Sequence, residues 1–240
     1  WNNASKSSIP RSGASSFGTV SSRPAKSGAG PYHEGHDHAP ERCRFMVARW
    51  QRTWWNTPVD PLLELLRERG FRRGHFVLSS GKESDFFIDC KPAVLLAQGH
   101  SLVGEALLGR IRDFLGPVSA VAGVELGGCP LASAVAYASW AEGSPIDAVY
   151  IRKSSKDHGT RKMLEGADHL EASAKLAIVE DTVTTGGSTL RAVQAVREAG
   201  FDVVGVIAIV DRLEGGADAI RDAGVAFSTL YDRADFMEDA

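Results

Sequence analysis

From Val59 onward, short apolar runs alternate with segments in which apolar residues recur at helical spacing. The runs typical of buried strands are residues 118–123, 146–151, 175–180, 202–210 and 225–230. The helical patterns are residues 98–115, 130–140, 188–199 and 214–223. Repeated strand–helix units with almost continuously apolar strands are typical of a parallel sheet that is covered on both faces. The pattern therefore predicts an α/β fold with a central parallel sheet flanked by helices.

A further helix and a strand pair are expected before these units. Asp60 suits an N-cap and Pro61 the first helical position, and Gly70 marks the end of the same apolar pattern. The runs 75–80 and 85–90 surround a Gly-Lys turn. They predict a hairpin, because two short strand-like runs around a turn usually pair with each other.

In two stretches the apolar residues follow neither the spacing of a helix nor that of a strand. Residues 1–58 are rich in Ser, Gly, Ala and Pro and carry eight Lys and Arg against three Asp and Glu. This segment predicts a disordered or non-native N-terminal extension, such as a transit peptide or the product of an overlong reading frame that should start at Met46. Residues 152–166 are polar and predict a loop. The folded domain is then expected to span residues 59–240.

Composition and charge exclude several classes of function. Hydrophobic residues make up 43% of the chain, yet its longest apolar runs fall far short of the roughly 20 residues of a membrane span. The net charge is −3, so no basic surplus indicates a nucleic-acid partner. The cysteines are an odd, scattered set without CxxC spacing, which favours a reducing compartment and a cytoplasmic location. They are Cys43, Cys90 and Cys129.

The most informative stretch is 175–189, KLAIVEDTVTTGGST, in which an apolar strand leads into a turn and a helix. Ligands of open α/β sheets bind beyond the carboxyl ends of the strands. Gly186 and Gly187 let backbone N–H groups approach a phosphate, and the N-terminus of the following helix favours the anion. Glu180 and Asp181 would repel a phosphate, but they can accept hydrogen bonds from sugar hydroxyls beside it. The stretch therefore predicts a site for a ribose 5-phosphate.

Two other interpretations of this stretch fit less well. It is neither a Walker A loop nor a GxGxxG fingerprint, because no Gly-Lys-Ser/Thr follows its glycines and their spacing differs. An ordinary surface turn would explain the Asp and Gly residues, which are common in turns. It would not explain why strand, acidic pair, hydroxyl residues, glycine pair and helix follow one another in register.

Three segments resemble a known family. VEDTVTTGGST (179–189) is similar to the phosphoribosyl diphosphate (PRPP) motif of type I phosphoribosyltransferases. IRKSSKDHG (151–159) resembles the mobile catalytic loop of the orotate phosphoribosyltransferases, and HFVLSSGKESDFFIDCK (75–91) resembles their N-terminal hood segment. The resemblance implies a type I phosphoribosyltransferase fold, with a small hood at about 59–95 and a core at about 96–232.

The resemblance also implies an activity and its residues. The activity is transfer of the phosphoribosyl group of PRPP to orotate, which yields orotidine 5′-monophosphate and diphosphate in pyrimidine (UMP) biosynthesis. The implied catalytic side chains are Lys156, Glu180 and Asp181. Orotate binding is implied for Thr184 and Arg212, and a planar guanidinium suits a planar carboxylate. The residues implied to bind PRPP are Arg152, Lys153, Lys156, His158, Glu180, Asp181, Thr182, Val183, Thr184, Thr185, Gly186, Gly187 and Ser188.

The charge of the resembling loop suits a diphosphate leaving group. Up to four cationic groups lie within seven residues, namely Arg152, Lys153, Lys156 and His158. Clustered donors and Mg²⁺ can neutralise the diphosphate as the C1–O bond breaks. We expect Mg²⁺ to be held mainly by the substrate rather than by protein ligands. The resemblance further implies a homodimer, in which loop 152–166 of one subunit reaches the site of the other.

The chain departs from the family pattern at two lysine positions, which Ser79 and Gly127 occupy. Both departures remove a cation that is expected near PRPP or the nucleotide. Lys82 and Lys91 are candidates to replace these cations. The first acid of the pair is Glu180 rather than Asp, which still offers a carboxylate.

Some alternatives stay open at this point. Phe86 and Phe87 in the hood segment either pack against the orotate ring or belong to the core. A purine-type phosphoribosyltransferase is one alternative function, against which the hood and loop motifs argue. A non-catalytic PRPP-sensing regulator that binds nucleic acid is another, which the net charge of −8 over residues 59–240 disfavours. We expect orotate and PRPP as small-molecule partners, and no nucleic acid or membrane.

Overall fold

The computed structural model describes residues 60–77, 83–153 and 163–237, and the structural statements below concern these residues. The predicted N-terminal extension lies outside them, so its nature stays a prediction. The turn of the predicted hairpin and most of the predicted loop also lie outside the described residues.

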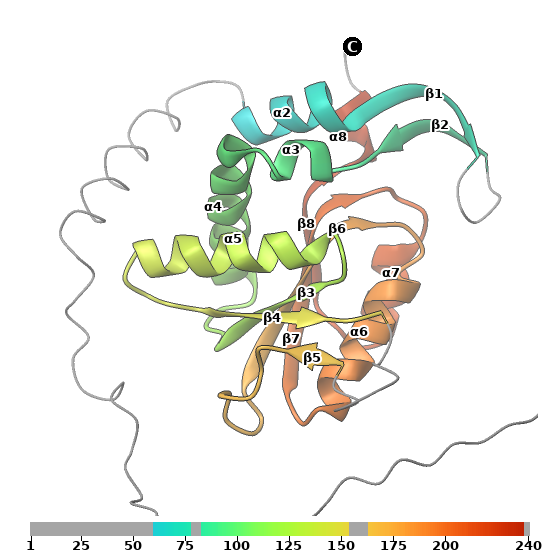
Figure 1. The fold of residues 1–240 in the computed structure, drawn as a ribbon. Coiled ribbons are helices and arrows are strands. Elements are labelled where there is room, and N and C mark those ends of the chain that lie inside the picture. The colour runs from blue at the N-terminus through green and yellow to red at the C-terminus, as the bar shows by residue number, and fades with distance from the viewer. Residues whose placement is uncertain (1–59, 78–82, 154–162, 238–240) are drawn as a thin grey trace, which may run out of the picture. The chain divides into compact units, whose positions relative to one another are not determined.

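Helices and strands alternate along the chain as the sequence predicts (Figure 1). The helices are α2 (Pro61–Gly70), α3 (Lys91–Val94), α4 (Ala97–Phe114), α5 (Gly128–Ala141), α6 (Gly187–Glu198), α7 (Gly216–Asp222) and α8 (Arg233–Met237). The strands are β1 (Phe71–Val77), β2 (Glu83–Ile88), β3 (Ala120–Val124), β4 (Asp147–Ile151), β5 (Leu164–Glu165), β6 (Lys175–Val183), β7 (Asp202–Asp211) and β8 (Phe227–Asp232). Each helix and strand predicted from the sequence overlaps one of these elements.

A six-stranded sheet forms the centre of the fold, in the order β5-β4-β3-β6-β7-β8. Strands β4, β3, β6, β7 and β8 pair in parallel, and only the two-residue strand β5 is antiparallel to its neighbour β4. The predicted parallel sheet is therefore confirmed. The chain adds β4 on one side of β3 and then β6, β7 and β8 on the other, so the strand order reverses between β3 and β6. Such a switch point is where open α/β sheets bind ligands.

Both faces of this sheet are buried, because successive side chains of a strand point to opposite faces and helices cover each of them. On one face, Val179 and Ile207 join a core that includes α2, α4 and α5. On the other face, Ile178 and Val206 join a core that includes α6 and α7. The double coverage explains why the strands read as nearly continuous apolar runs.

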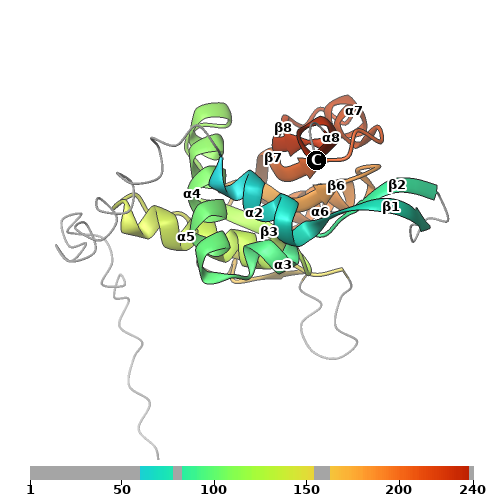
Figure 2. The same ribbon diagram turned by 90° about the horizontal axis from the view of Figure 1, so that it is seen from above.

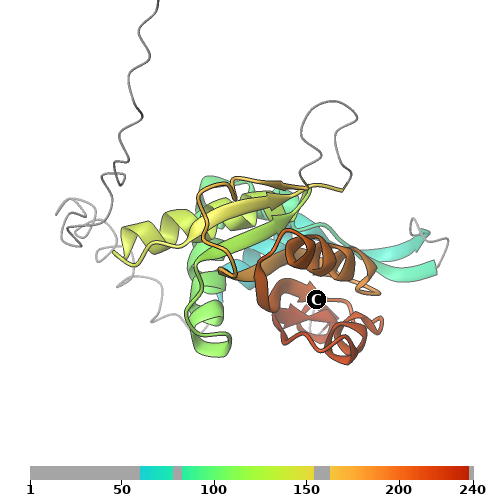
Figure 3. The same cartoon turned by 90° about the horizontal axis from the view of Figure 1, so that it is seen from below.

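The hood consists of a hairpin and the helices that flank it. β1 and β2 form a separate antiparallel pair, which extends outward from the large sheet (Figure 3). α2 begins at the predicted N-cap, since Asp60 Oδ1 accepts the backbone N–H of Leu62 at 2.9 Å. Seen from above, α2 crosses α4 and runs beside α3 (Figure 2). Leu62 and Leu66 are buried in the same core as Leu107 of α4, so hood and core share one apolar interior.

The structure corrects several details of the predicted pattern. The expectation that residues 152–166 form only a loop is wrong at β5, where Leu164 is buried and pairs with β4. β1 starts at Phe71 rather than 75, because it follows α2 directly and pairs with Ile88. The short helices α3 and α8 were not predicted. α8 is held by Phe236, which is buried with its ring centroid 5.6 Å from that of Phe71.

Candidate active site

Two neighbouring carboxylates lie at the carboxyl end of β6. β6 extends to Val183, so Glu180 and Asp181 are successive strand residues that point to opposite faces. Glu180 is only 5% exposed, and its Oε1 accepts a hydrogen bond from the Thr189 hydroxyl at 3.1 Å. Asp181 Oδ1 accepts the backbone N–H of Thr182 at 2.9 Å. One acid therefore faces the first turn of α6, and the other faces α3.

Burial sets the charge of this pair. Burial, with a smaller contribution from the charge of Asp181, raises the pKa of Glu180 to about 8. The Thr189 hydrogen bond and the charge of Lys153 partly oppose this rise. Burial also raises the pKa of Asp181, but the charge of Lys91 opposes it. Glu180 thus keeps its proton to a higher pH than an exposed carboxyl group.

A tight turn joins β6 to α6, where the sequence predicts a phosphate cradle. Gly186 has a φ of 79°, a left-handed conformation that favours glycine, and a Cβ there would lie 3.0 Å from the carbonyl oxygen of Gly216. α6 begins at Gly187, and no side chain caps its first turn. Its N–H groups can therefore face an anion. Thr185 and Ser188 are exposed at the same turn and offer hydroxyl donors.

The remaining predicted residues of the PRPP motif have different surroundings. Val183 is buried in the core beneath α6, so only its backbone can take part in a site. Its carbonyl accepts the backbone N–H of Arg212 at 3.0 Å, which places half-buried Thr184 beside the end of β7. The Thr182 hydroxyl lies 3.7 Å from the Sγ of Cys90, in the segment before α3.

Arg212, directly after β7, is fixed between the hood and the core. Its side chain is only 5% exposed, Nη2 donates to Ser84 Oγ at 3.1 Å, and Nε lies 3.0 Å from Glu214 Oε1 without the geometry of a hydrogen bond. Its guanidinium lies over the ring of Phe86, 4.5 Å from the centroid. Phe86 is 2% exposed and therefore belongs to the core, whereas Phe87 is 38% exposed.

The start of the predicted catalytic loop lies near the same end of the sheet. Arg152 Nη1 donates to Glu165 Oε1 at 3.2 Å, which holds its guanidinium against β5. The backbone N–H of Lys153 donates to Glu125 Oε2 at 3.0 Å, just after β3. The loop therefore begins at the carboxyl end of β4, beside that of β3, and the chain returns in β5, which pairs with β4. The other two predicted cations, which lie outside the described residues, are Lys156 and His158.

Two neighbours of Asp181 come from segments that the sequence pattern did not assign to the site. The backbone of Gly127 approaches so closely that a Cβ would overlap the Asp181 carboxylate. The Nζ of Lys91 lies 3.9 Å from Asp181 Oδ2. The sequence indicated Lys91 only by its position directly after the hood strand, as a candidate to replace a family lysine. Of the other positions considered for these lysines, Ser79 and Lys82 lie outside the described part of the chain.

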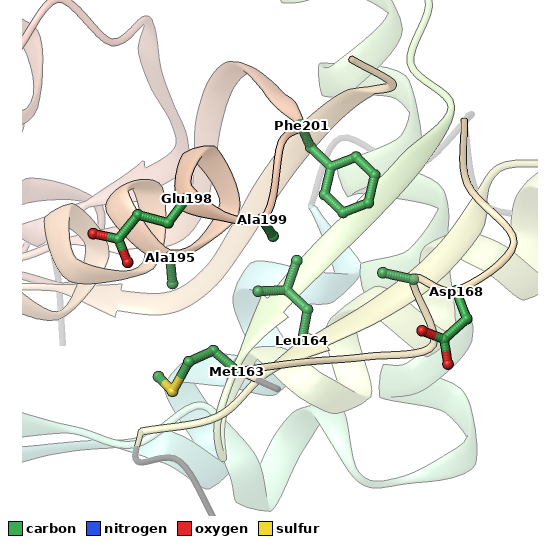
Figure 4. Close-up of a pocket in the computed structure, with 8 residues that line it drawn as sticks. Met163, Leu164, Asp168, Ala195, Glu198, Ala199 and Phe201 are labelled. Atoms are coloured by element: carbon green, nitrogen blue, oxygen red, sulfur yellow. The ribbon is translucent and has the colours of Figure 1, made fainter. Parts of the chain in front are cut away.

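A cavity of about 370 Å³ lies elsewhere, between the end of α6 and the segment around β5 (Figure 4). Its lining residues are Met163, Leu164, Ala167, Asp168, Ala195, Glu198, Ala199 and Phe201. The α6 residues among them are in its C-terminal half, roughly 12–16 Å along the helix from Gly187 at about 1.5 Å per residue. The cavity is therefore separate from the cradle.

The described residues contain neither a metal-binding cluster nor a helix able to span a membrane. Within residues 60–77, 83–153 and 163–237, His, Cys, Asp and Glu side chains form no group of three or more that could hold a metal ion. In the same part of the chain, no helix has both the length and the apolar character needed to cross a membrane.

Comparison with known proteins identifies the family. A family model of the phosphoribosyl transferase domain matches residues 96–230. The orotate phosphoribosyltransferase of Sorangium cellulosum (strain So ce56) is 56% identical over 180 residues, which cover 75% of this chain and 93% of that protein. That of Bradyrhizobium sp. (strain ORS 278) is 41% identical over 178 residues, covering 73% and 95%.

Solved structures agree with these relatives. The structure of Mycobacterium tuberculosis H37Rv orotate phosphoribosyltransferase in complex with PRPP has a TM-score of 0.62 and 35% identity, and the match covers 74% of this chain and 98% of that one. The same enzyme in complex with Fe(III) dicitrate has a TM-score of 0.64 and 38% identity, covering 74% and 97%. The chain therefore belongs to the orotate phosphoribosyltransferases and has their type I phosphoribosyltransferase fold.

Proposed function

We propose that the carboxyl ends of β6 and β7 form the site at which this chain transfers the phosphoribosyl group of PRPP to orotate. The observation that carries the proposal is the turn from β6 to α6, where Glu180 and Asp181 lie beside an uncapped helix N-terminus. An anion cradle next to a pair of hydroxyl acceptors suits a phosphorylated ribose. The products are orotidine 5′-monophosphate and diphosphate.

In this proposal PRPP binds through its phosphate and its ribose. The N–H groups of the first turn of α6, with the hydroxyls of Thr185 and Ser188, hold the 5′-phosphate. Asp181 accepts a hydrogen bond from a ribose hydroxyl, and such bonds to a charged acceptor are about twice as strong as neutral ones. Glu180, which keeps its proton to a higher pH than an exposed carboxyl group, is able to donate as well as accept a hydrogen bond.

The reaction needs no protein nucleophile. The C1–O bond of PRPP breaks through an oxocarbenium-like transition state, and its electron pair leaves with the diphosphate. The loop cations Arg152, Lys153, Lys156 and His158 neutralise that charge, with Lys156 the side chain we expect to act at the reacting centre. Mg²⁺, held mainly by the oxygens of the substrate, would supply further neutralisation when bound.

Orotate is proposed to bind at the junction of the hood and the core. The guanidinium of Arg212 has five N–H donors in a fixed plane, and the contacts with Ser84, Glu214 and Phe86 fix that plane. A planar anion such as orotate matches this geometry. Thr184 lies beside it through the backbone bond between β6 and β7 and offers a hydroxyl to the same ligand.

A homodimer is part of the proposal. Tyr137 and Trp140 are exposed three residues apart on α5, and Leu126 is exposed on the segment that leads into this helix through Gly127. Exposed large apolar side chains that are close together favour contact with another protein surface. A second copy that covers this segment would come close to Asp181, because Gly127 contacts its carboxylate. This arrangement would let the loop of one subunit serve the site of the other.

We also propose a cytoplasmic location. The two cysteines within the described part of the chain, Cys90 and Cys129, are free thiols. Burial raises the pKa of both thiols, which makes the reactive thiolate form scarce. Free thiols are the usual state of cysteine in a reducing compartment.

One assay tests the proposed function. The purified full chain is incubated with PRPP, Mg²⁺ and orotate, and the loss of orotate absorbance is followed. Adenine, guanine, hypoxanthine and uracil serve as rival acceptors in separate reactions. We expect turnover with orotate and stoichiometric diphosphate release. Turnover of a purine but not of orotate would overturn the proposal, and PRPP binding without any turnover would favour a regulator.

A further inference from the structure

Lys91, the first residue of α3, has an ammonium whose position is fixed before any substrate binds. Its Nζ lies 2.6 Å from Oδ1 of Asp89, and the same oxygen accepts the backbone N–H of Lys91 at 3.1 Å. On its other side the ammonium lies 3.9 Å from Oδ2 of Asp181. Lys91 therefore bridges a hood carboxylate and the carboxylate that we assign to the ribose.

The start of α3 is itself held on β6. Cys90 is fully buried, and its Sγ lies 3.6 Å from the carbonyl oxygen of Asp181 and 3.7 Å from the Thr182 hydroxyl. Pro92 occupies the first turn of α3 and limits the backbone there. These contacts keep Lys91 next to Asp181, although the two residues are far apart in the sequence.

The neighbouring segment cannot supply the same charge. The loop before α5 contacts Asp181 through Gly127, where a side chain would overlap the carboxylate. Lys153, the other described cation near the acidic pair, lowers the pKa of Glu180 through its charge. The positive charge that faces the Asp181 carboxylate thus comes from the hood side of the site.

We propose that Lys91 is a positioning residue of the PRPP site, whose ammonium, set between Asp89 and Asp181, holds the carboxylate of Asp181 in place for the ribose. The inference rests on the proposed function, in which Asp181 accepts a ribose hydroxyl. It assigns to the hood segment a task in PRPP binding, in addition to the contact with Arg212.

The charged groups around Asp181 determine the expected pH effect. Lys91 and Asp89 face it from the hood segment, and Glu180 precedes it in β6. Cys90 stays a neutral thiol, since burial raises its pKa to about 12. Burial and Asp89 raise the pKa of Asp181, and Lys91 lowers it. Without Lys91, a higher pH is needed to ionise Asp181, so the acidic limb of the PRPP profile moves to higher pH.

The experiment compares Lys91→Met, Lys91→Gln and Lys91→Arg with the parent chain. For each, kcat/KM for PRPP and for orotate is measured between pH 5.5 and 9. Lys175→Met is the matched control, because it removes the same charge from an exposed position at the other end of β6. Lys91 is 40% exposed, so we expect all variants to fold, and thermal unfolding checks this.

We expect Lys91→Met and Lys91→Gln to lower kcat/KM for PRPP about tenfold at pH 7, because a small displacement of a group in the site slows a reaction steeply, and to move the acidic limb to higher pH. Lys91→Arg should restore most of the activity, and Lys175→Met should match the parent. Unchanged PRPP kinetics and an unchanged acidic limb in both neutral variants would overturn the inference, as would an equal loss for both substrates. Asp181→Asn separates the two proposals. If Asp181→Asn loses most of its activity while the Lys91 variants keep the kcat/KM of the parent, only this inference fails. If Asp181→Asn is fully active, the proposed site itself is wrong.

Discussion

Replacing Gly127 with alanine should damage the site through one methyl group. A Cβ at this position would overlap the carboxylate of Asp181, so the carboxylate must rotate away. The rotation breaks the hydrogen bond that it accepts from the Thr182 N–H at 2.9 Å. The variant therefore starts from a carboxylate that points away from the ribose.

The size of the effect follows from the overlap. An extra methyl group in a site without room for it costs about 1–3 kcal/mol. In the Gly127→Ala variant this cost is added to the barrier whenever Asp181 takes its productive position in the transition state. Because about 1.4 kcal/mol corresponds to a tenfold change in rate, kcat/KM for PRPP should fall roughly 5- to 150-fold.

The measurement is orotate-dependent diphosphate release with PRPP varied at saturating orotate. Gly109→Ala in α4 is the control, because a Cβ there meets nothing within 4 Å. The control should keep full activity and gain slightly in stability, since Ala is favoured over Gly in helices by about 1 kcal/mol. A Gly127→Ala enzyme whose kcat/KM stays within twofold of the parent would show that the contact with Asp181 does not matter for catalysis.

Three further predictions follow from the site. Burial raises the pKa of Glu180 to about 8 from its ordinary value of 4.5, so the folded state holds this proton where the unfolded state has lost it. The free energy of unfolding should therefore fall as the pH rises from about 4.5 through about 8. Urea unfolding at pH 6 and pH 9 should show a smaller fall for Glu180→Gln than for the parent. An equal fall in both proteins would contradict the prediction. Arg212→Ala should raise KM for orotate far more than KM for PRPP in steady-state assays, and an equal rise would indicate a structural role. Homodimers of Lys156→Ala and of Asp181→Asn should each be nearly inactive, yet after unfolding and reassociation together roughly a quarter of all sites should regain activity, because half of the dimers are then mixed. A mixture that forms mixed dimers but regains nothing would mean that the loop serves its own subunit.

The β6–α6 part of the site could be predicted because its signals are local. An apolar run, two acids, a glycine pair and a helical pattern stand next to one another, and each follows from backbone geometry that a short segment sets by itself. The structure has β6, the turn and α6 in that order, with Gly186 in the left-handed conformation that the glycine signal implies. The predicted strand ended too early, at Glu180. β6 continues through Asp181, Thr182 and Val183 because this end of the strand pairs with β7, which the residues' own polarity does not indicate.

The parts that could not be predicted depend on contacts between distant segments. β5 has two residues and exists only because β4 offers an edge to pair with, which no local pattern records. α8 is placed by Phe236 packing on Phe71, at the opposite end of the domain sequence. The meeting of Lys91 with Asp181 likewise depends on how the hood packs on the sheet. Sequence reasoning could name this lysine as a candidate but could not give it a partner.

Because the hood and the sheet share one core, the segment that the family model matches differs from the segment that folds as one unit. The family match begins at residue 96, yet Leu62 and Leu66 of α2 fill the same apolar interior as Leu107 and Ile111 of α4. A fragment cut where the match begins would expose that interior, so the stretch that the family model covers is smaller than the unit that can fold cooperatively. Chimeras that exchange hoods between relatives would therefore have to carry the facing side of α4 with them. Evolution of substrate preference in the hood is constrained in the same way, because a change there is also a change in the stability of the whole molecule.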